Sequence, residues 1–249
     1  MQNYFAHKHT VHYSEVDGKF RLRLDSVLST FQMLTFFHST QMQVDAPTLA
    51  ERCEAFWVLS RMKYEIRRLP TMGDDLLLTT WPTTVTPFRF LRDYTIEGAS
   101  GESLIVGTSE WCTLDIHSRL LRKSSTIAYP FDMPHWERRS GCAPFLKVRV
   151  AVGEENYHHA HTVRFGDLDS NGHTNNVMYM RMALDTFAPE EFFDLPIVGV
   201  EMEYTTQSYF GDEVRIYRAV CEHGLYIEGR VENKKVFHCL LSLAKSGKM

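Results

Sequence analysis

Residues 165–176, FGDLDSNGHTNN, carry the group of side chains in this chain that is best suited to acid–base chemistry. The run combines aspartates, asparagines and a histidine, and it leads directly into the apolar-periodic segment 177–187. A polar cluster at a strand-to-helix junction places general acid–base groups beside the partly positive N-terminus of a helix. Such a junction suits polarising a carbonyl group and handling a water molecule. The alternative is a plain helix-entry loop, because Asp, Asn, Ser and Gly are common turn and N-cap residues.

Composition limits the kind of protein that can present this run. The 249 residues are 44% hydrophobic and 12% aromatic, which is enough apolar material for one large domain or two ordinary ones. The sequence has no apolar run of membrane-spanning length, and its first ten residues lack the apolar core of a signal peptide, so we expect a cytoplasmic protein without a membrane span. The five scattered cysteines contain no CxxC pair and indicate neither a disulfide framework nor a thiolate zinc site.

Charged residues and histidines give weaker signals. The net charge of −4 gives no argument for nucleic-acid binding. Local basic clusters are compatible with solvated strand ends or, taken together, with a docking face for an acidic partner. These clusters are Arg61/Lys63/Arg67/Arg68, Arg89/Arg92, Arg119/Arg122/Lys123 and Arg138/Arg139. The histidines outside the 165–176 run, His158, His159 and His161 among them, lack metal-ligand spacing with carboxylates, and we expect them to face solvent. The sequence also has no nucleotide-binding motif, so no metal and no cofactor is expected.

The chain repeats one plan of elements in its two halves. YSEVDG at 13–18 corresponds to FGDLDS at 165–170, and each follows a short alternating strand, predicted over 9–13 and 161–165. In the first half a helix follows, with Asp25 as its expected N-cap. One face of this helix is predicted to comprise Val27, Leu28, Phe31, Leu34 and Phe37. In the second half Asn175 is the expected cap of a helix with Val177, Met180, Ala183, Leu184 and Phe187 on one face.

Long strands with a period-two pattern follow both helices. The first strand is predicted over 56–66 and the second over 198–204, and each leads to a Gly-Asp turn. Further strands are expected over 89–97, 104–116, 214–220 and 225–244. Each half is therefore one helix wrapped by an antiparallel sheet, which is an α+β plan. The proline-rich segment that starts at Tyr129 is expected to be a linker.

The junction and several first-half motifs resemble a known family. DLDSNGHTNNV at 167–177, together with Tyr179, closely resembles the signature of acyl-[acyl-carrier-protein] thioesterases. WVLSR at 57–61, PTMGD at 70–74 and TW at 80–81 are also typical of that family. The resemblance covers nearly the whole chain, and the compact length of the chain looks like that of a bacterial member. It implies a double hotdog fold of two tandem repeats, and it implies hydrolysis of the thioester that joins a fatty acyl chain to the carrier's phosphopantetheine arm.

The resemblance also assigns catalytic residues. The family's Asp-x-Asn-x-His motif falls on Asp169, Asn171 and His173, which implies a base or nucleophile, a group that holds water or carbonyl, and a histidine that tunes Asp169 or protonates the leaving sulfur. The family's Glu-Cys pair falls on Gln207-Ser208. This is a departure, because Ser208 cannot supply a thiolate and Gln207 cannot act as a base. Gln207 can still donate a hydrogen bond, so it stays a candidate catalytic residue, whereas Ser208 is interpreted as structural.

The first half lacks the Asn and His of the junction, so it is predicted to bind the acyl chain rather than to hydrolyse the thioester. We expect Phe31, Leu34, Phe37 and Trp57 to line an acyl tunnel, although simple core packing explains the helix residues equally well. Asn175 and Asn176 either contact substrate or cap their helix. The expected domains are an acyl-binding repeat over 1–128, a linker over 129–150 and a catalytic repeat over 151–249.

The partner implied by the resemblance is an acyl carrier protein that carries a fatty acyl chain, and either a monomer or a homodimer is expected. Two alternatives stay open. One is a hotdog thioesterase that acts on acyl-coenzyme A, whose phosphates would also suit the basic clusters. The other is a non-catalytic acyl-binding or carrier-docking module, which the Gln207-Ser208 departure favours.

Overall fold

The structure, a computed structural model, describes residues 3–132 and 136–244 of the chain. It divides into two compact units, Met1–Ala143 and Pro144–Met249, which are treated separately below. In the described part of the chain, no helix has the length and apolar character that crossing a membrane requires.

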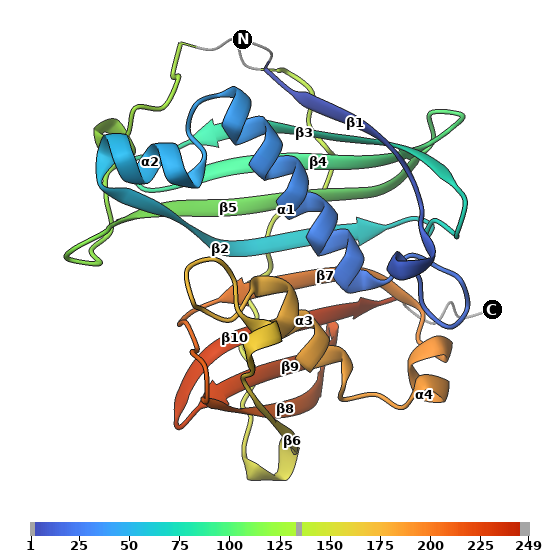
Figure 1. Cartoon of the computed structure of the whole chain (residues 1–249). Helices are drawn as coiled ribbons and strands as arrows, with labels where there is room; N and C mark the ends of the chain where they lie inside the picture. Colours follow the sequence, from blue (N-terminus) through green and yellow to red (C-terminus); the bar gives the residue numbers. More distant parts are fainter. Residues whose placement is uncertain (1–2, 133–135, 245–249) are drawn as a thin grey trace. The chain divides into compact units, whose positions relative to one another are not determined.

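Unit 1 is a five-stranded antiparallel sheet with a long helix, α1, against one face (Figure 1). The strand order is β1-β3-β4-β5-β2. Its elements are β1 (Phe5–Thr10), α1 (Leu24–Gln41), α2 (Ala46–Cys53), β2 (Ala55–Ile66), β3 (Asp75–Val85), β4 (Phe90–Gly98) and β5 (Ser103–Asp115). Strand β3 and helix α2 were not predicted from the sequence. The bounds of β2, β4 and β5 lie within one residue of the predicted bounds.

The core of unit 1 forms where α1 lies on the sheet. Val27, Leu28, Phe31 and Leu34 are buried as predicted, and the Phe31 ring stacks on Tyr94 with centroids 4.3 Å apart. The prediction that Phe37 shares this face is wrong, because its side chain is 45% exposed. Successive helix positions are about 100° apart, and the inward face continues through the fully buried His38.

The N-terminus of α1 also differs from the prediction. Arg23, not Asp25, is the N-cap residue, and it contributes no side-chain capping hydrogen bond. Asp25 lies inside the first turn, where the Arg23 guanidinium pairs with it through Nε–Oδ1 at 2.9 Å. A carboxylate in the first turn is favourable there because it faces the positive end of the helix dipole.

Unit 2 repeats the plan with a second five-stranded antiparallel sheet and a shorter helix, α3 (Figure 1). The strand order is β7-β10-β9-β8-β6. Its elements are β6 (Tyr157–Thr162), α3 (Asn176–Leu184), α4 (Pro189–Asp194), β7 (Ile197–Tyr204), β8 (Glu213–Cys221), β9 (Gly224–Val231) and β10 (Lys234–Leu243). Asn175 is the N-cap of α3, as predicted, and accepts the Val177 N–H at 2.9 Å.

Three details of the strand prediction are corrected. The predicted strand 225–244 is two strands, because a turn at 232–233, with Glu232 at φ 55°, separates β9 from β10. The predicted strands 9–13 and 161–165 end early, at Thr10 and Thr162. A 3₁₀ turn begins soon after each of them, over Tyr13–Glu15 and Phe165–Asp167. The overall α+β plan of two helix-on-sheet repeats is confirmed.

Two histidines contradict the expectation that all histidines outside the junction face solvent. His38 is fully buried in α1, and His238 in β10 is 7% exposed. His161 is half-buried, and its Nε2 lies 2.8 Å from Oδ2 of Asp167.

Candidate active site

The junction between β6 and α3 is a tight loop that the Asp169 carboxylate holds together. Its Oδ1 accepts the backbone N–H of Asn171 at 2.8 Å and that of His173 at 3.1 Å. The Asp169 N–H in turn donates to the His173 carbonyl at 2.8 Å, and Gly172 supports the turn at φ 76°. Among the described residues, none donates a hydrogen bond to the other carboxylate oxygen, Oδ2. One oxygen of Asp169 therefore shapes the loop and the other is available for chemistry.

Asp167 also stabilises this loop, through its side chain and its backbone carbonyl. Its carboxylate is buried, accepts the Arg164 N–H at 2.8 Å through Oδ2 and pairs with His161 through the same oxygen. Its carbonyl accepts the Asn175 N–H at 2.8 Å. The two aspartates of the motif thus have different surroundings: Asp167 is buried and paired with His161, whereas Asp169 is only partly buried and has no ion pair among the described residues.

The His173 ring lies against an aromatic residue that the sequence analysis did not single out. Its centroid is 5.3 Å from that of Tyr209, in an edge-to-face arrangement. The Tyr209 hydroxyl donates to Oε1 of Gln207 at 3.4 Å, so Tyr209 links the candidates His173 and Gln207. The side chain of Asn171 is exposed, and both Asn171 and His173 reach the Asp169 carboxylate through backbone N–H groups. Tyr209 gave no signal beforehand because its role depends on the bridge that pairs it with His173.

The backbone N–H groups around the N-terminus of α3 are the candidate donors to a carbonyl oxygen at this junction. The Thr174 N–H donates to the Ser208 carbonyl, and the N–H groups of Asn175 and Val177 are occupied as described above. The Asn176 N–H is left without an acceptor in the described part of the chain. A preorganised backbone donor of this kind stabilises a developing oxyanion by about 3 kcal/mol. The Asn175 side chain is used as the helix cap.

Ser208 is fully buried behind the loop. Its Oγ lies 2.7 Å from Oγ1 of Thr174 and 2.9 Å from the hydroxyl of Tyr179, and its backbone N–H donates to that same hydroxyl at 3.1 Å. Burial is the largest cause that raises the pKa of Tyr179 above its ordinary value, so this phenol is a neutral hydrogen-bonding group. These contacts agree with the interpretation of Ser208 as structural.

Unit 1 contains the same loop with one difference. Asp17 Oδ1 accepts the N–H groups of Lys19 at 2.8 Å and Arg21 at 2.9 Å, which are the positions of Asn171 and His173 in unit 2. The Arg21 side chain also pairs with Oδ2 of Asp17, through Nη2 at 3.0 Å and Nε at 3.1 Å. In unit 1 the second carboxylate oxygen is therefore neutralised.

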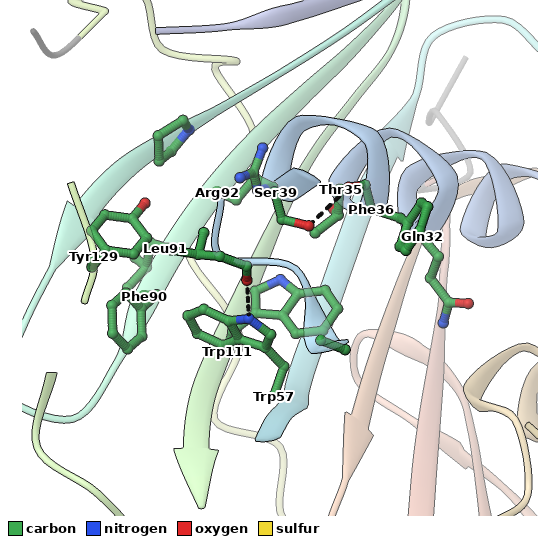
Figure 2. Close-up of a pocket in the computed structure, with 13 residues that line it drawn as sticks. Gln32, Thr35, Phe36, Ser39, Trp57, Phe90, Leu91, Arg92, Trp111 and Tyr129 are labelled. Carbon is green, nitrogen blue, oxygen red and sulfur yellow. Dashed lines mark hydrogen bonds between the residues drawn. The ribbon is translucent and has the colours of Figure 1, made fainter. Parts of the chain in front are cut away.

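A cavity of about 150 Å³ lies in unit 1, between α1 and the sheet (Figure 2). Of the four residues expected to line an acyl tunnel, only Trp57 lines this cavity. Phe31 and Leu34 are buried in the core, and Phe37 lies on the surface. The Trp57 indole N–H donates to the Val44 carbonyl at 2.7 Å, which fixes the ring as one wall.

The remaining lining combines aromatic, aliphatic and polar side chains from several segments of unit 1. These residues are Gln32, Thr35, Phe36, Ser39, Val44, Ala46, Pro82, Phe90, Leu91, Arg92, Trp111 and Tyr129. Arg92 and Lys63 are buried, so the predicted surface clusters that include them are smaller than the sequence suggested. Over residues 3–132 and 136–244, no group of three or more His, Cys, Asp or Glu side chains is arranged to hold a metal ion.

Comparisons with known proteins agree with this architecture. The family model for the acyl-ACP thioesterase N-terminal domain matches residues 2–126, and the model for the acyl-ACP thioesterase C-terminal domain matches residues 151–248. An acyl-[acyl-carrier-protein] hydrolase of Cuphea viscosissima is 27% identical over 195 residues, which are 73% of this chain and 46% of the relative. An oleoyl-acyl carrier protein thioesterase of Coriandrum sativum is 26% identical over 71% of this chain and 50% of its own. The chain thus spans about half the length of these relatives.

Solved structures establish the fold. An acyl-ACP thioesterase from Bacteroides thetaiotaomicron superimposes with a TM-score of 0.83 at 23% identity, covering 97% of this chain and 98% of the other. A 12:0-ACP thioesterase from Umbellularia californica gives a TM-score of 0.84 at 17% identity, covering 98% of both chains. The predicted double hotdog fold is confirmed.

Proposed function

Because the chain belongs to the acyl-ACP thioesterase family, we propose that it hydrolyses the thioester of fatty acyl-[acyl-carrier protein] and releases the free fatty acid. The observation that carries this proposal is the arrangement of the Asp169 carboxylate. Its Oδ1 accepts two backbone hydrogen bonds that fix the group in the loop, while its Oδ2 has no donor among the described residues. A catalytic base needs this combination of fixed position and free lone pairs.

Asp169 is proposed to take a proton from a water molecule as that water attacks the thioester carbonyl. The new C–O bond forms as the carbonyl oxygen becomes an oxyanion, which the Asn176 N–H stabilises. Collapse of this intermediate re-forms the carbonyl and breaks the C–S bond. The sulfur leaves as the thiol of the phosphopantetheine arm, with a proton that His173 delivers. Asn171 and Gln207 are proposed to orient the water and the substrate carbonyl.

The two repeats are proposed to divide the work. Unit 2 carries the reactive loop, and unit 1 binds part of the acyl chain through the cavity at Trp57. The pairing of Asp17 with Arg21 supports this division, because it removes the free carboxylate oxygen from the unit 1 loop. The acyl carrier protein as partner, a cytoplasmic location and a monomeric or homodimeric state stay predictions, as do the linker over 129–150 and the tunnel roles of Phe31, Leu34 and Phe37.

A mixed pool of acyl-carrier proteins tests the reaction and the substrate together. The free acids that the protein releases identify the chain lengths it accepts, and matched acyl-coenzyme A thioesters serve as competitors. Faster release from acyl-carrier protein supports the proposal. Equal or faster hydrolysis of acyl-coenzyme A would contradict the carrier assignment, and acyl-carrier binding without release would indicate a non-catalytic module, which the Gln207-Ser208 departure favours.

A further inference from the structure

A buried guanidinium group forms part of the wall of the unit 1 cavity. Arg92 of β4 is 6% exposed, and its side chain lines the cavity together with aromatic rings (Figure 2). Its Nη1 lies 2.9 Å from Nδ1 of His38 and donates to Oγ1 of Thr80 at 3.2 Å. Its Nη2 makes a long contact of 3.9 Å with the sulfur of Met42. Within the described residues, no carboxylate is among these partners.

The charge of Arg92 is therefore solvated but not neutralised by the protein. Burial is the largest cause that lowers the pKa of Arg92, yet an arginine side chain stays protonated in proteins. The neighbouring Asp93 does not supply the missing anion. Successive strand residues face opposite sides of a sheet, and the Asp93 carboxylate accepts the Ser140 N–H at 2.9 Å and lies 3.4 Å from Nε of Arg139. A buried cation without a counter-ion is costly, so a bound anion would stabilise it.

The rest of the cavity suits a short hydrocarbon chain. Trp57, Phe90 and Trp111 contribute aromatic surface, and Val44 and Pro82 add aliphatic surface. The Trp57 and Phe90 rings meet edge to face at 4.8 Å, which makes this part of the wall rigid. A cavity of about 150 Å³ accommodates a molecule the size of benzene, or about six carbon atoms.

We propose that this cavity is a binding site for aliphatic carboxylates, with the carboxylate on Arg92 and the chain against Trp57, Phe90 and Trp111. Arginine binds carboxylates with charge-assisted, often bidentate hydrogen bonds, which makes it selective for this headgroup. The carboxylate comes either from a free fatty acid or from the far end of a dicarboxylic acyl chain. The site goes beyond the proposed hydrolysis, and its occupation does not require turnover.

Binding of three six-carbon probes to the intact protein tests the proposal. Hexanoate, 1-hexanol and hexylamine are titrated separately and followed by calorimetry and by tryptophan fluorescence, to which Trp57 and Trp111 in the cavity wall would respond. We expect hexanoate to bind at least about tenfold more tightly than 1-hexanol, and hexylamine to bind most weakly. Equal affinities for hexanoate and 1-hexanol, or no binding of hexanoate, would overturn the proposal.

Variants locate the site. Arg92→Gln should remove the preference for hexanoate over 1-hexanol, whereas Arg89→Gln, which removes an exposed cation outside the cavity lining, should keep it. Should Arg92→Gln fail to fold, Ala46→Trp places a large ring at an exposed position of the lining and should abolish hexanoate binding. Unchanged hexanoate binding in Ala46→Trp would refute this location.

Two further ligands distinguish the sources of the carboxylate. Competition with hexanoate by longer free fatty acids alone assigns the site to a free acid. Competition also by the mono-pantetheine thioester of hexanedioic acid assigns it to the far end of an acyl chain. Because these are binding measurements, an inactive thioesterase that still binds hexanoate through Arg92 would disprove the proposed hydrolysis and leave the carboxylate site intact.

Discussion

Asp169 and Asp17 occupy the same position in the two repeats, and each accepts, through Oδ1, the backbone N–H groups of the residues two and four positions later. They differ at the second oxygen, which pairs with the Arg21 side chain in unit 1 and has no described protein donor in unit 2. The shared hydrogen bonds explain why both loops need an aspartate. The difference indicates why only one of them is suited to catalysis.

Replacing His173 tests its proposed role as proton donor to the leaving sulfur. His173→Ala should lower kcat by about 100-fold or more, because a positioned acid–base group typically contributes at least that much. The loop should persist, since its hydrogen bonds to Asp169 use the His173 backbone. Steady-state kinetics on acyl-carrier protein measure the effect. Tyr209→Phe keeps the ring beside His173 and serves as the control, and a comparable loss in that variant would argue against a specific role for His173.

Removing the N-cap of α3 should affect the stability of the protein. Asn175→Ala removes the acceptor of the Val177 N–H and should lower the free energy of unfolding by about 1 kcal/mol. Asn175→Asp keeps a capping oxygen and should retain stability. Urea unfolding of both variants checks this, and equal stability of wild type and Asn175→Ala would show that the cap is unimportant.

Ser208→Ala separates structure from nucleophilic chemistry. The change removes the hydroxyl that contacts Thr174 and Tyr179 and should cost about 1–3 kcal/mol of stability. The rate of fatty-acid release should change little, because Asp169 and water are the proposed reactive pair. A collapse of activity in a folded Ser208→Ala protein would instead indicate a serine nucleophile.

The packing of α1 on its sheet is sensitive at Gly107 of β5. A Cβ atom at this position would overlap the Phe31 ring and lie 3.0 Å from the Lys63 carbonyl oxygen. Phe31 cannot easily move, because it stacks on Tyr94. Gly107→Ala should therefore destabilise the protein by about 1–3 kcal/mol in urea unfolding. Gly166→Ala, where no atom lies within 4 Å of the added Cβ, is the matched control, and similar losses in both variants would contradict this account.

Local sequence signals predicted the elements with clear periodicity. The face of α1 that contains Phe31 and the cap at Asn175 follow from helix spacing and capping chemistry. Strand β3 was missed because most of its central residues are buried on both faces and Pro82 interrupts its pattern. Periodicity gives no signal for such a strand. Helix α4 has only six residues, too few to show a helical period.

The residue types of the site could be predicted from the sequence, but the contacts between their side chains could not. The motif identified Asp169, yet the contrast with Asp17 depends on where the Arg21 side chain lies. The burial of Arg92 was also hidden, because a charged strand residue is ordinarily exposed. It is buried here because His38 and Thr80, which are distant in the sequence, supply its hydrogen-bonding partners.

The most direct test compares Asp169→Asn with Asp17→Asn. An asparagine oxygen can still accept both loop hydrogen bonds, so both variants should fold, but only Asp169→Asn removes the proposed base. The rate of free fatty-acid release from acyl-carrier protein should fall by about 100-fold or more in Asp169→Asn and stay near wild type in Asp17→Asn. A folded Asp169→Asn protein that releases fatty acid at the wild-type rate would contradict the central claim.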